Sequence, residues 1–553
     1  MKTVAIGIQD FAKFKERNAF YIDKTGFIKD WWNNGDDVTI LLRPRRFGKT
    51  LLLDTVNKFF SFEYKDRADL FDGLSIMKDE HFAAMQGTKP VISLTFADIK
   101  GRNLDTAMYM LKSNISFLFS RYKNIIDISR LEPREQEQYK QYDEDMPTDR
   151  ASKSIKFLSS IVEKYFGQKV LLLLDEYDTP MIEAYTHGYW QNMVDFMRNF
   201  FNSSFKTNPS VERVLMTGIN RVSKQSLFSD FNNAQIFSIM DDKYTSACGF
   251  TQDEVDAALE EYNLLDQREA VKSYYDGFIV GNEHGIYNPW SFTSFLKMGK
   301  LADYWVDTAS NDLISSLFFY GGTKLQTQLG NLLCDQAIEV MIEENLNFVD
   351  ISTSNKNIWS FLYAAGYIKA ELIDPNQKLY SITITNGETK NMFAKMVLQW
   401  FDTTEDYYPE FSRALISDQV DEMNAYLGEL ILAVTSQHDM AKKPENFYHG
   451  LVLGLTVDLR RNYIITSNRE SGLGRYDVII EARDQSKAII IEFKTLGKGE
   501  ETLEDTVRRA LEQIESKAYA TELIARGIQS ENIYKYGFAF QGKTVLIAKG
   551  EKD

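Results

Sequence analysis

The first half of the chain alternates short apolar runs with longer amphipathic stretches. The short runs consist of Val, Ile and Leu with almost no polar interruption, so both faces of each strand would be buried. Such strands, separated by helical patterns, are typical of a parallel sheet covered by helices on both sides. The strands predicted in this way are Val38–Leu42, Val91–Phe96, Val170–Leu174 and Val214–Thr217.

The middle of the chain has a different pattern. A polar, charge-rich segment over residues 131–152 predicts a solvated helix or a surface loop. After about Thr245 the periodicity becomes mostly helical. From about Ile358 a helical pattern is followed by two strand-like runs around a polar turn, which is the outline of a winged-helix-like unit.

A second α/β pattern occupies the C-terminal part. A new helical run starts near Phe411, and two strong strands follow at Tyr476–Ala482 and Ala488–Phe493. A single long helix is predicted from about Glu504 to Arg526, and a last hairpin closes the chain. The predicted fold class is therefore α/β, with a parallel-sheet domain over 1–245, a helical and winged-helix-like region over 246–410, and a second α/β domain over 411–553.

Composition limits the functions that this chain could have. An apolar fraction of 44% in 553 residues is that of a packed globular protein with several cores. The formal net charge of −16 argues against a protein that coats DNA nonspecifically, but it leaves room for one local basic groove. The two cysteines form no zinc motif, and no apolar run approaches the ~20 residues of a membrane span. We therefore expect a cytoplasmic protein that has no membrane segment.

The first predicted strand leads into the segment Arg43–Thr50 (RPRRFGKT), and a helical pattern follows. This order is typical of a P-loop, whose backbone amides open a helix toward nucleotide phosphates. Gly48 would let the backbone approach a phosphate, Lys49 would reach the β- and γ-phosphates, and Thr50 would offer its hydroxyl to Mg²⁺. The predicted cofactor is ATP with Mg²⁺. The candidate binding residues are Arg45, Arg46, Phe47, Gly48, Lys49 and Thr50.

Acidic residues follow the third predicted strand, as in a Walker B segment. Asp175 would hold Mg²⁺ and Glu176 would polarise the attacking water. A helix cap or a surface acidic cluster is the alternative, and the leucines of the strand argue against it. After the fourth strand, Asn220 is a candidate sensor of the γ-phosphate and Arg221 a candidate phosphate contact, although a plain surface turn is an equal alternative. Asp178 has no role assigned by the pattern.

Several segments occur in an order that resembles the AAA-ATPase-like family found in many bacterial proteins. They are YIDKT, LLRPRRFGKTLLL, LLLLDEYDTP, TGINRVSKQSLFSDFNN and YNPWSF, and the resemblance covers about residues 2–305. Arg43 occupies a position where the full P-loop pattern has glycine, and the RPRRFGK form is that family's own version of the loop. The resemblance implies nucleotide binding. It also implies a P-loop NTPase sheet over residues 1–245. Many ATPases of this type need an arginine from a neighbouring copy, so the oligomeric state is left open, with a homo-oligomer as one alternative.

A second candidate site lies in the C-terminal strands. Glu492 and Lys494 are two residues apart on one strand and therefore face the same side, while Phe493 faces the core. Asp477 begins the paired strand near the same end of the hairpin. An exposed salt-bridge ladder is the alternative, but the apolar run before Glu492 indicates a central strand. The pattern predicts Asp477 and Glu492 as ligands of Mg²⁺ or Mn²⁺, with Lys494 orienting the attacking water.

Other residues extend this site. Gln513, on the helix after the Glu492 strand, would contact phosphate or orient water, with an ordinary exposed helix residue as the alternative. The stretch from about Glu445 to Tyr519 resembles the PD-(D/E)XK nuclease superfamily domain that accompanies the AAA-ATPase-like family. The resemblance implies a restriction-endonuclease-like fold over residues 411–553 and an auxiliary metal-binding glutamate. Glu470 is slightly preferred because it is closer in sequence to Asp477, whereas helix context favours Glu445.

Together these patterns predict an ATP-regulated, metal-dependent nuclease. The expected substrate is nucleic acid, DNA in preference to RNA. The alternative is a nucleotide-dependent switch or scaffold, in which an inactive nuclease fold only binds a partner. The intact set of Asp477, Glu492 and Lys494 favours the nuclease, because a pseudoenzyme would have lost one of these residues more often.

Overall fold

The computed structural model describes residues 2–221, 233–306, 314–315, 317–318, 322–333, 335–343, 355–399, 407–434, 448, 451–452, 455–456, 459, 462–467, 470–471, 474–475, 477–497, 502–542 and 544–550. The chain divides into two compact units. The first comprises Met1–Trp305 with Met341–Lys369, and the second comprises Val306–Val340 with Ala370–Asp553. The three-domain division at 245 and 410 stays a prediction.

The first unit is built on a five-stranded sheet whose neighbouring strands all run parallel, in the order β2-β3-β4-β1-β5. Its strands are β1 (Val38–Leu42), β2 (Val91–Thr95), β3 (Val170–Asp175), β4 (Val211–Gly218) and β5 (Ala234–Phe237). Every residue of β1 and β3 is buried, which is why their sequences are apolar on both faces. The four strands expected from the apolar runs are confirmed, and β5 is an addition.

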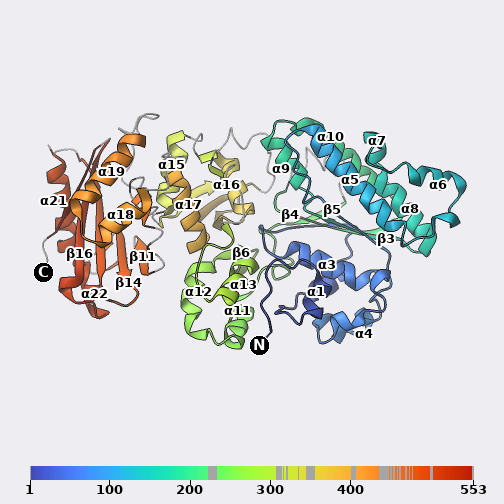
Figure 1. Cartoon of the computed structure of the whole chain (residues 1–553), viewed down its shortest axis with the longest axis horizontal. Coiled ribbons are helices and arrows are strands. Elements are labelled where there is room, and N and C mark those ends of the chain that lie inside the picture. Colours follow the sequence, from blue (N-terminus) through green and yellow to red (C-terminus); the bar gives the residue numbers. More distant parts are fainter. Residues whose placement is uncertain are drawn as a thin grey trace. The chain divides into compact units, whose positions relative to one another are not determined.

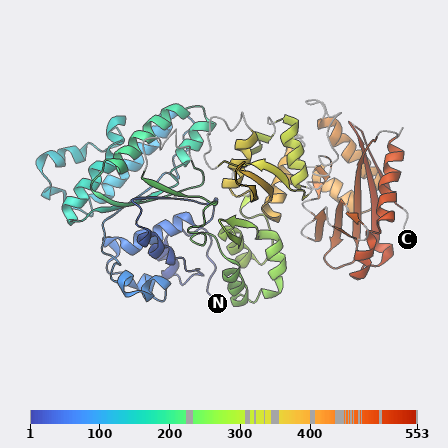
Figure 2. The same cartoon turned by 180° about the vertical axis from the view of Figure 1, so that it is seen from behind.

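Helices cover both faces of this sheet (Figure 1). The view from behind shows the same two layers (Figure 2). One face carries α3, together with α1 and α4, and the other carries α5, α8, α9 and α10. The helices are α1 (Phe11–Glu16), α2 (Gly26–Asn34), α3 (Lys49–Phe60), α4 (Glu80–Ala83), α5 (Leu104–Tyr122), α8 (Ser154–Phe166), α9 (Thr179–Thr186) and α10 (Trp190–Phe201).

The charge-rich segment over residues 131–152 is more packed than its composition indicates. It forms α6 (Pro133–Lys140) and α7 (Thr148–Ala151). The rings of Tyr139 and Tyr142 are buried against Phe119 of α5, with centroid distances of 5.0 and 4.2 Å. The expected helix is present, but its aromatic side chains anchor it to the domain.

The rest of the first unit is mainly helical, as the pattern predicts. It contains α11 (Gln252–Glu261), α12 (Arg268–Tyr275), α13 (Pro289–Met298) and α16 (Asn355–Ala364), with a short hairpin of β6 (Phe278–Val280) and β7 (Glu283–Ile286). Residues from α11, α12, α13 and the N-terminal segment share one core, which includes Val4, Phe20, Val255, Tyr275 and Phe292.

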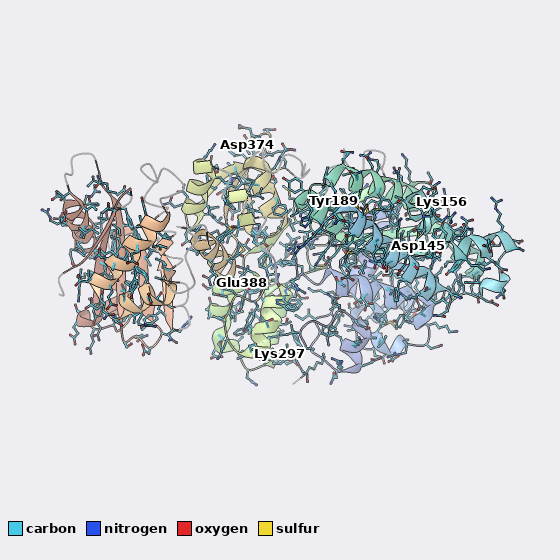
Figure 3. The ribbon with its side chains drawn as sticks, turned by 45° about the horizontal axis from the view of Figure 1, so that its top comes forward. Asp145, Lys156, Tyr189, Lys297, Asp374 and Glu388 are labelled. Atoms are coloured by element: carbon cyan, nitrogen blue, oxygen red, sulfur yellow. The ribbon has the colours of Figure 1, made fainter. Side chains whose placement is uncertain are left out.

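The second unit begins with a small α/β region. It contains α15 (Gly322–Leu333), β8 (Ile338–Met341), β9 (Ile368–Asp374), β10 (Leu379–Ile384) and α17 (Gly387–Gln399), and its sheet has the order β8-β10-β9. The predicted helix followed by a hairpin is confirmed as α16, β9 and β10. Asp374, labelled in Figure 3, accepts a hydrogen bond from the Asn376 amide at 2.8 Å and so organises the hairpin turn.

The C-terminal region has a five-stranded mixed sheet in the order β11-β14-β15-β16-β17. The strands are β11 (Tyr463–Ser467), β14 (Val478–Ala482), β15 (Ala488–Thr495), β16 (Ile533–Gln541) and β17 (Thr544–Lys549). β15 is central and runs parallel to β16, and the other pairs are antiparallel. Two very short strands, β12 (Glu470–Ser471) and β13 (Gly474–Arg475), pair with each other.

Helices lie on both faces of this sheet as well. The α18 helix (Tyr407–Ile416) places Phe411 against Phe538 of β16, while α21 (Leu503–Ser516) contacts β16 at the neighbouring Gly537. Successive strand residues point to opposite faces, so α18 and α21 are on opposite sides. The α19 helix (Val420–Val434) contacts β17 through Asn424, which donates to the Ile547 carbonyl at 2.8 Å.

The prediction of one long helix over 504–526 is wrong. The helix α21 ends at Ser516, and α22 starts again at Ala520 and runs to Ala525. Between them Ala518 has a φ of 53°, a left-handed conformation that interrupts an α-helix. Among the described residues, no helix combines the length and apolar character that crossing a membrane requires.

Candidate nucleotide and nuclease sites

The loop between β1 and α3 has the conformation that a phosphate-binding loop needs. Gly48, which precedes the helix, has a φ of 88°, and the space around its Cα is open. A side chain would be strained there, and its absence lets the helix amides approach an anion. Arg45 and Arg46 are exposed, while Phe47 is buried and its ring contacts Phe278 at 4.8 Å.

Lys49 lies under this loop. Its ammonium donates to the carbonyl of Arg43 at 2.9 Å and to the carbonyl of Pro44 at 2.8 Å. Burial lowers its pKa, and the nearby carboxylates of Glu176, Asp178 and Asp175 oppose that shift. The phosphate-binding loop therefore holds a buried cation that lies close to the carboxylates following β3.

The Walker B acid meets the P-loop threonine directly. The Thr50 hydroxyl donates to Asp175 Oδ2 at 2.7 Å, and the hydroxyl of Thr217 on β4 donates to Asp175 Oδ1. Burial raises the pKa of Asp175, and the two hydroxyl bonds oppose this by stabilising the ionised form. Parallel pairing of β3 with β4 and of β4 with β1 brings these residues to one edge of the sheet.

Glu176 and Asp178 have different environments. Glu176 has a φ of 52° and accepts a hydrogen bond from the Thr179 hydroxyl at 3.1 Å. Asp178 is buried and accepts the backbone amides of Ile219 at 2.9 Å and Asn220 at 2.8 Å, while burial raises its pKa. The carboxylate of Asp178 therefore fixes the end of β4, a role that the sequence pattern did not indicate.

The candidate sensor Asn220 is brought to the same edge. It is buried, and its carbonyl accepts the Tyr177 hydroxyl at 2.8 Å. Its side-chain Oδ1 is also buried and has no hydrogen-bond partner among the described residues. Such a group is costly unless something that is not part of the chain satisfies it, so this amide fits a site for a bound polar ligand. Arg221 follows it and is half-buried.

The second site lies in the C-terminal sheet. β14 and β15 pair so that Val478 faces Ile491, and continuing this register places Asp477 opposite Glu492. Asp477 Oδ2 accepts the Phe493 amide at 2.8 Å. Glu492 is 1% exposed, so its carboxylate is buried in the sheet rather than part of an exposed ladder.

Lys494 and Gln513 converge on the same carboxylate. Lys494 Nζ lies 3.1 Å from Glu492 Oε1, and Gln513 Nε2 donates to that oxygen too. Phe493 points to the opposite face, where its ring contacts Phe538 at 5.4 Å. The alternation expected along this strand is confirmed, and the structure brings Asp477, Glu492, Lys494 and Gln513 together.

Comparison with known proteins agrees with these two geometries. Residues 5–228 match the family described as "Predicted AAA-ATPase", and residues 443–550 match the PD-(D/E)XK nuclease superfamily. The chain thus contains an AAA-ATPase-like domain and a PD-(D/E)XK superfamily domain. The resemblance stated from the sequence motifs is confirmed for both.

Individual relatives give less information about function than the two family matches do. The chain is 28% identical over 321 residues to the "Uncharacterized protein in vnfD 5'region" of Azotobacter chroococcum mcd 1. That match covers 57% of this chain and 56% of the relative, so it spans little more than half of the relative's length. A solved structure, the Aeropyrum pernix ORC2 protein in ADPNP–ADP complexes, matches with 12% identity and a TM-score of 0.24, covering 68% of this chain and 92% of that one.

Sequence reasoning missed one residue of the PD-(D/E)XK domain. Gln513 Nε2 also donates to the hydroxyl oxygen of Tyr519 at 3.2 Å, and Tyr519 is buried. Burial raises the pKa of Tyr519, and the nearby Glu492 and Asp477 raise it further. Tyr519 stands six residues after Gln513, and an unbroken helix would have placed it on another face.

The two candidates for the auxiliary glutamate of this domain are Glu470 and Glu445. The backbone of Glu470 lies in β12, paired with Arg475 of β13. Glu445 lies outside the described residues. No group of three or more His, Cys, Asp or Glu side chains in the described part of the chain is arranged to hold a metal.

The chemistry of the donor set decides whether divalent ions fit the two domains. Asp477 and Glu492 offer carboxylate oxygens from facing strand positions, and Thr50 with Asp175 offers a hydroxyl and a carboxylate 2.7 Å apart. Hard oxygen donors of this kind are those that Mg²⁺ and Mn²⁺ prefer. The residues therefore fit such an ion in both domains.

Proposed function

We propose that the AAA-ATPase-like domain binds and hydrolyses ATP. The hydrogen bond between Thr50 and Asp175 supports this, since it joins the P-loop hydroxyl to the Walker B carboxylate. These two groups would hold Mg²⁺, which supplies charge neutralisation on the β- and γ-phosphates. Lys49 would exchange its loop carbonyls for phosphate oxygens, and Glu176 would orient the attacking water. Asn220 would sense the γ-phosphate by donating from its side-chain Nδ2, and its buried Oδ1 would accept a hydrogen bond from a water molecule.

The substitution Lys49→Ala tests nucleotide binding. Charge-assisted hydrogen bonds contribute about 1.5–3 kcal/mol, so ATP affinity should fall at least tenfold. Lys164→Ala is a matched control, because Lys164 is a half-exposed lysine of the same domain, paired with Glu135. Isothermal titration with ATP would measure both variants, and equal affinities would contradict ATP binding at this loop.

We further propose that the PD-(D/E)XK domain cleaves phosphodiester bonds of nucleic acid, with DNA preferred over RNA. The convergence of Lys494 on the buried Glu492, opposite Asp477, supports this proposal. These two carboxylates would hold Mg²⁺, with Mn²⁺ as a substitute, and the ion supplies stabilisation of the negative charge that builds up on the phosphate. Lys494 would orient the attacking water, and Gln513 would keep Glu492 in position.

We also propose that the nucleotide controls cleavage. Residues Met341–Lys369 belong to the first unit, yet the chain on either side of them belongs to the second. Within this segment Gly366 packs so closely on the P-loop that a Cβ there would lie 2.9 Å from Pro44 Cγ. Rearrangement of the loop would therefore move a segment that continues directly into β9. We also propose a homo-oligomer in which one copy supplies an arginine to the nucleotide site of its neighbour.

One experiment tests cleavage and its control together. Plasmid DNA, single-stranded DNA and RNA are incubated with Mg²⁺ or Mn²⁺, with and without ATP, for the wild type, Asp477→Ala and Asp484→Ala. Asp484 is a matched control, because it lies in the exposed turn between β14 and β15 and its carboxylate accepts hydrogen bonds from the amide and hydroxyl of Ser486 within that turn. Cleavage lost only in Asp477→Ala supports the nuclease. ATP-binding protein that cleaves nothing would instead support the switch or scaffold.

A further inference from the structure

The YNPWSF segment (Tyr287–Phe292) packs against the P-loop. Asn288 is 1% exposed, and its Nδ2 donates to the Arg45 carbonyl at 3.2 Å. Its Oδ1 accepts the amides of Trp290 at 2.9 Å and Ser291 at 3.3 Å, so the same side chain caps the start of α13. One buried amide thus ties the start of this helix to the backbone of the phosphate loop.

The next contact involves the ring of Trp290. The guanidinium carbon of Arg46 lies 4.4 Å from the centroid of this ring. The indole is itself fixed, because Trp290 Nε1 donates to the Tyr304 carbonyl at 3.1 Å. Arg46 has a φ of 63°, so the loop backbone also adopts an uncommon conformation at this residue. Ring and backbone together define where the guanidinium lies.

The charge of Arg46 is available to a ligand. Across the part of the chain that the structure describes, no carboxylate lies within 4.0 Å of the Arg46 guanidinium. Stacking on an aromatic face uses the π-faced side of the guanidinium and leaves its in-plane N–H donors exposed. Those donors match the geometry of phosphate oxygens, and Arg46 stands two residues before Gly48 in the loop.

We propose that Asn288 and Trp290 are positioning residues of the nucleotide site, which hold the Arg45 backbone and the Arg46 guanidinium so that Arg46 binds the polyphosphate of ATP. The inference rests on the proposed binding of ATP at this loop. It assigns the YNPWSF segment a function in ligand recognition, beyond its packing in the core of the first unit.

Four variants of the full chain test the proposal by isothermal titration with ATP and with ADP. Arg46→Gln removes the charge and should weaken ATP binding roughly 10- to 100-fold. Trp290→Leu removes the aromatic face but keeps the charge, and should weaken ATP binding about 2- to 30-fold. Trp290→Phe keeps an aromatic face and should restore most of the affinity. Asn288→Ser keeps a capping oxygen but is too short to reach Arg45, so it should weaken ATP binding while α13 stays capped.

The matched control is Arg130→Gln, which removes another arginine stacked on an aromatic ring of the same domain, 5.2 Å from the centroid of Tyr165. It should bind ATP as the wild type does. Wild-type protein that does not bind ATP would refute the proposed function itself. If the wild type binds ATP and Arg46→Gln binds it as tightly as Arg130→Gln does, only the inference is overturned. Trp290→Phe as weak as Trp290→Leu would reduce Trp290 to a packing residue and would also overturn it.

Discussion

Gly537 offers a direct test of how the nuclease-type site is held together. In the register of β15 and β16, Gly537 pairs with Glu492. The α21 helix crosses it so closely that a Cβ built on Gly537 would lie 2.9 Å from the Val507 carbonyl oxygen and 3.1 Å from Leu511 Cγ. The same helix carries Gln513, which donates to Glu492. The absence of a side chain at 537 therefore sets the distance between the helix and the carboxylate.

The size of the effect follows from these distances. Ordinary van der Waals contact begins near 3.4 Å, so Gly537→Ala requires α21 to retreat by about 0.5 Å at a backbone atom that cannot rotate away. Overpacking of this kind costs about 1–3 kcal/mol. The same shift draws Gln513 away from Glu492. Because a misplacement of about 1 Å can reduce a rate by about 100-fold, cleavage should fall by roughly tenfold.

Gly428 supplies the control. It lies within α19 of the same unit, and nothing is within 4 Å of the Cβ that an alanine would add. Gly428→Ala should stabilise its helix by about 0.4–1 kcal/mol, because alanine restricts the unfolded chain. Hydrogen exchange of the β15 and β16 amides measures the local free energy of opening for both variants. If Gly537→Ala protected these amides as well as the wild type does, the close approach of α21 would not be a constraint on this site.

Two further predictions concern single hydroxyl groups. Tyr519→Phe removes the oxygen that accepts from Gln513, so the cleavage rate should fall several-fold while the fold and its melting temperature are retained; an unchanged rate would contradict a role for Tyr519. Thr217→Val removes a bond that stabilises the ionised Asp175, so the pKa of Asp175 should rise further above its ordinary value. Mg²⁺–ATP binding needs the ionised form. It should therefore be lost at a higher pH in Thr217→Val than in the wild type when titrations are repeated at decreasing pH, and coincident midpoints would refute this.

The sequence predicted the strands whose physical signal is local. β1 and β3 are buried along their whole length, so their sequences are continuous apolar runs. β5 (Ala234–Phe237) is at the edge of the same sheet, and none of its residues is fully buried. An edge strand half exposed to solvent needs no apolar run, and therefore left no pattern to recognise.

The nuclease-type site shows the same division between local and long-range information. The positions of Glu492 and Lys494 follow from the two-residue period of a strand, which the sequence carries by itself. The position of Tyr519 depends on the break at Ala518, a non-glycine residue in a left-handed conformation. No local signal marks that break, because alanine is the best helix former. Only packing of Tyr519 into the core between the sheet and α21 accounts for it.

Arg43 shows why a departure from a motif need not be a loss. The side chain donates to carbonyl groups at the ends of β1 and β5 and in the segment that follows β5. The distances are 2.7 Å to Leu42, 3.2 Å to Phe237, 2.9 Å to Ser238, 3.5 Å to Lys243 and 2.7 Å to Tyr244. Burial lowers its pKa to about 10, so it stays protonated at neutral pH.

The guanidinium of Arg43 therefore serves as a link between the start of the phosphate loop and the edge of the sheet. The close backbone approach that glycine provides is needed at Gly48, where φ is 88°, and glycine is present there. With an arginine at position 43, the loop keeps all the residues that we assign to phosphate binding. It cannot, by itself, favour the inactive switch or scaffold over an ATPase.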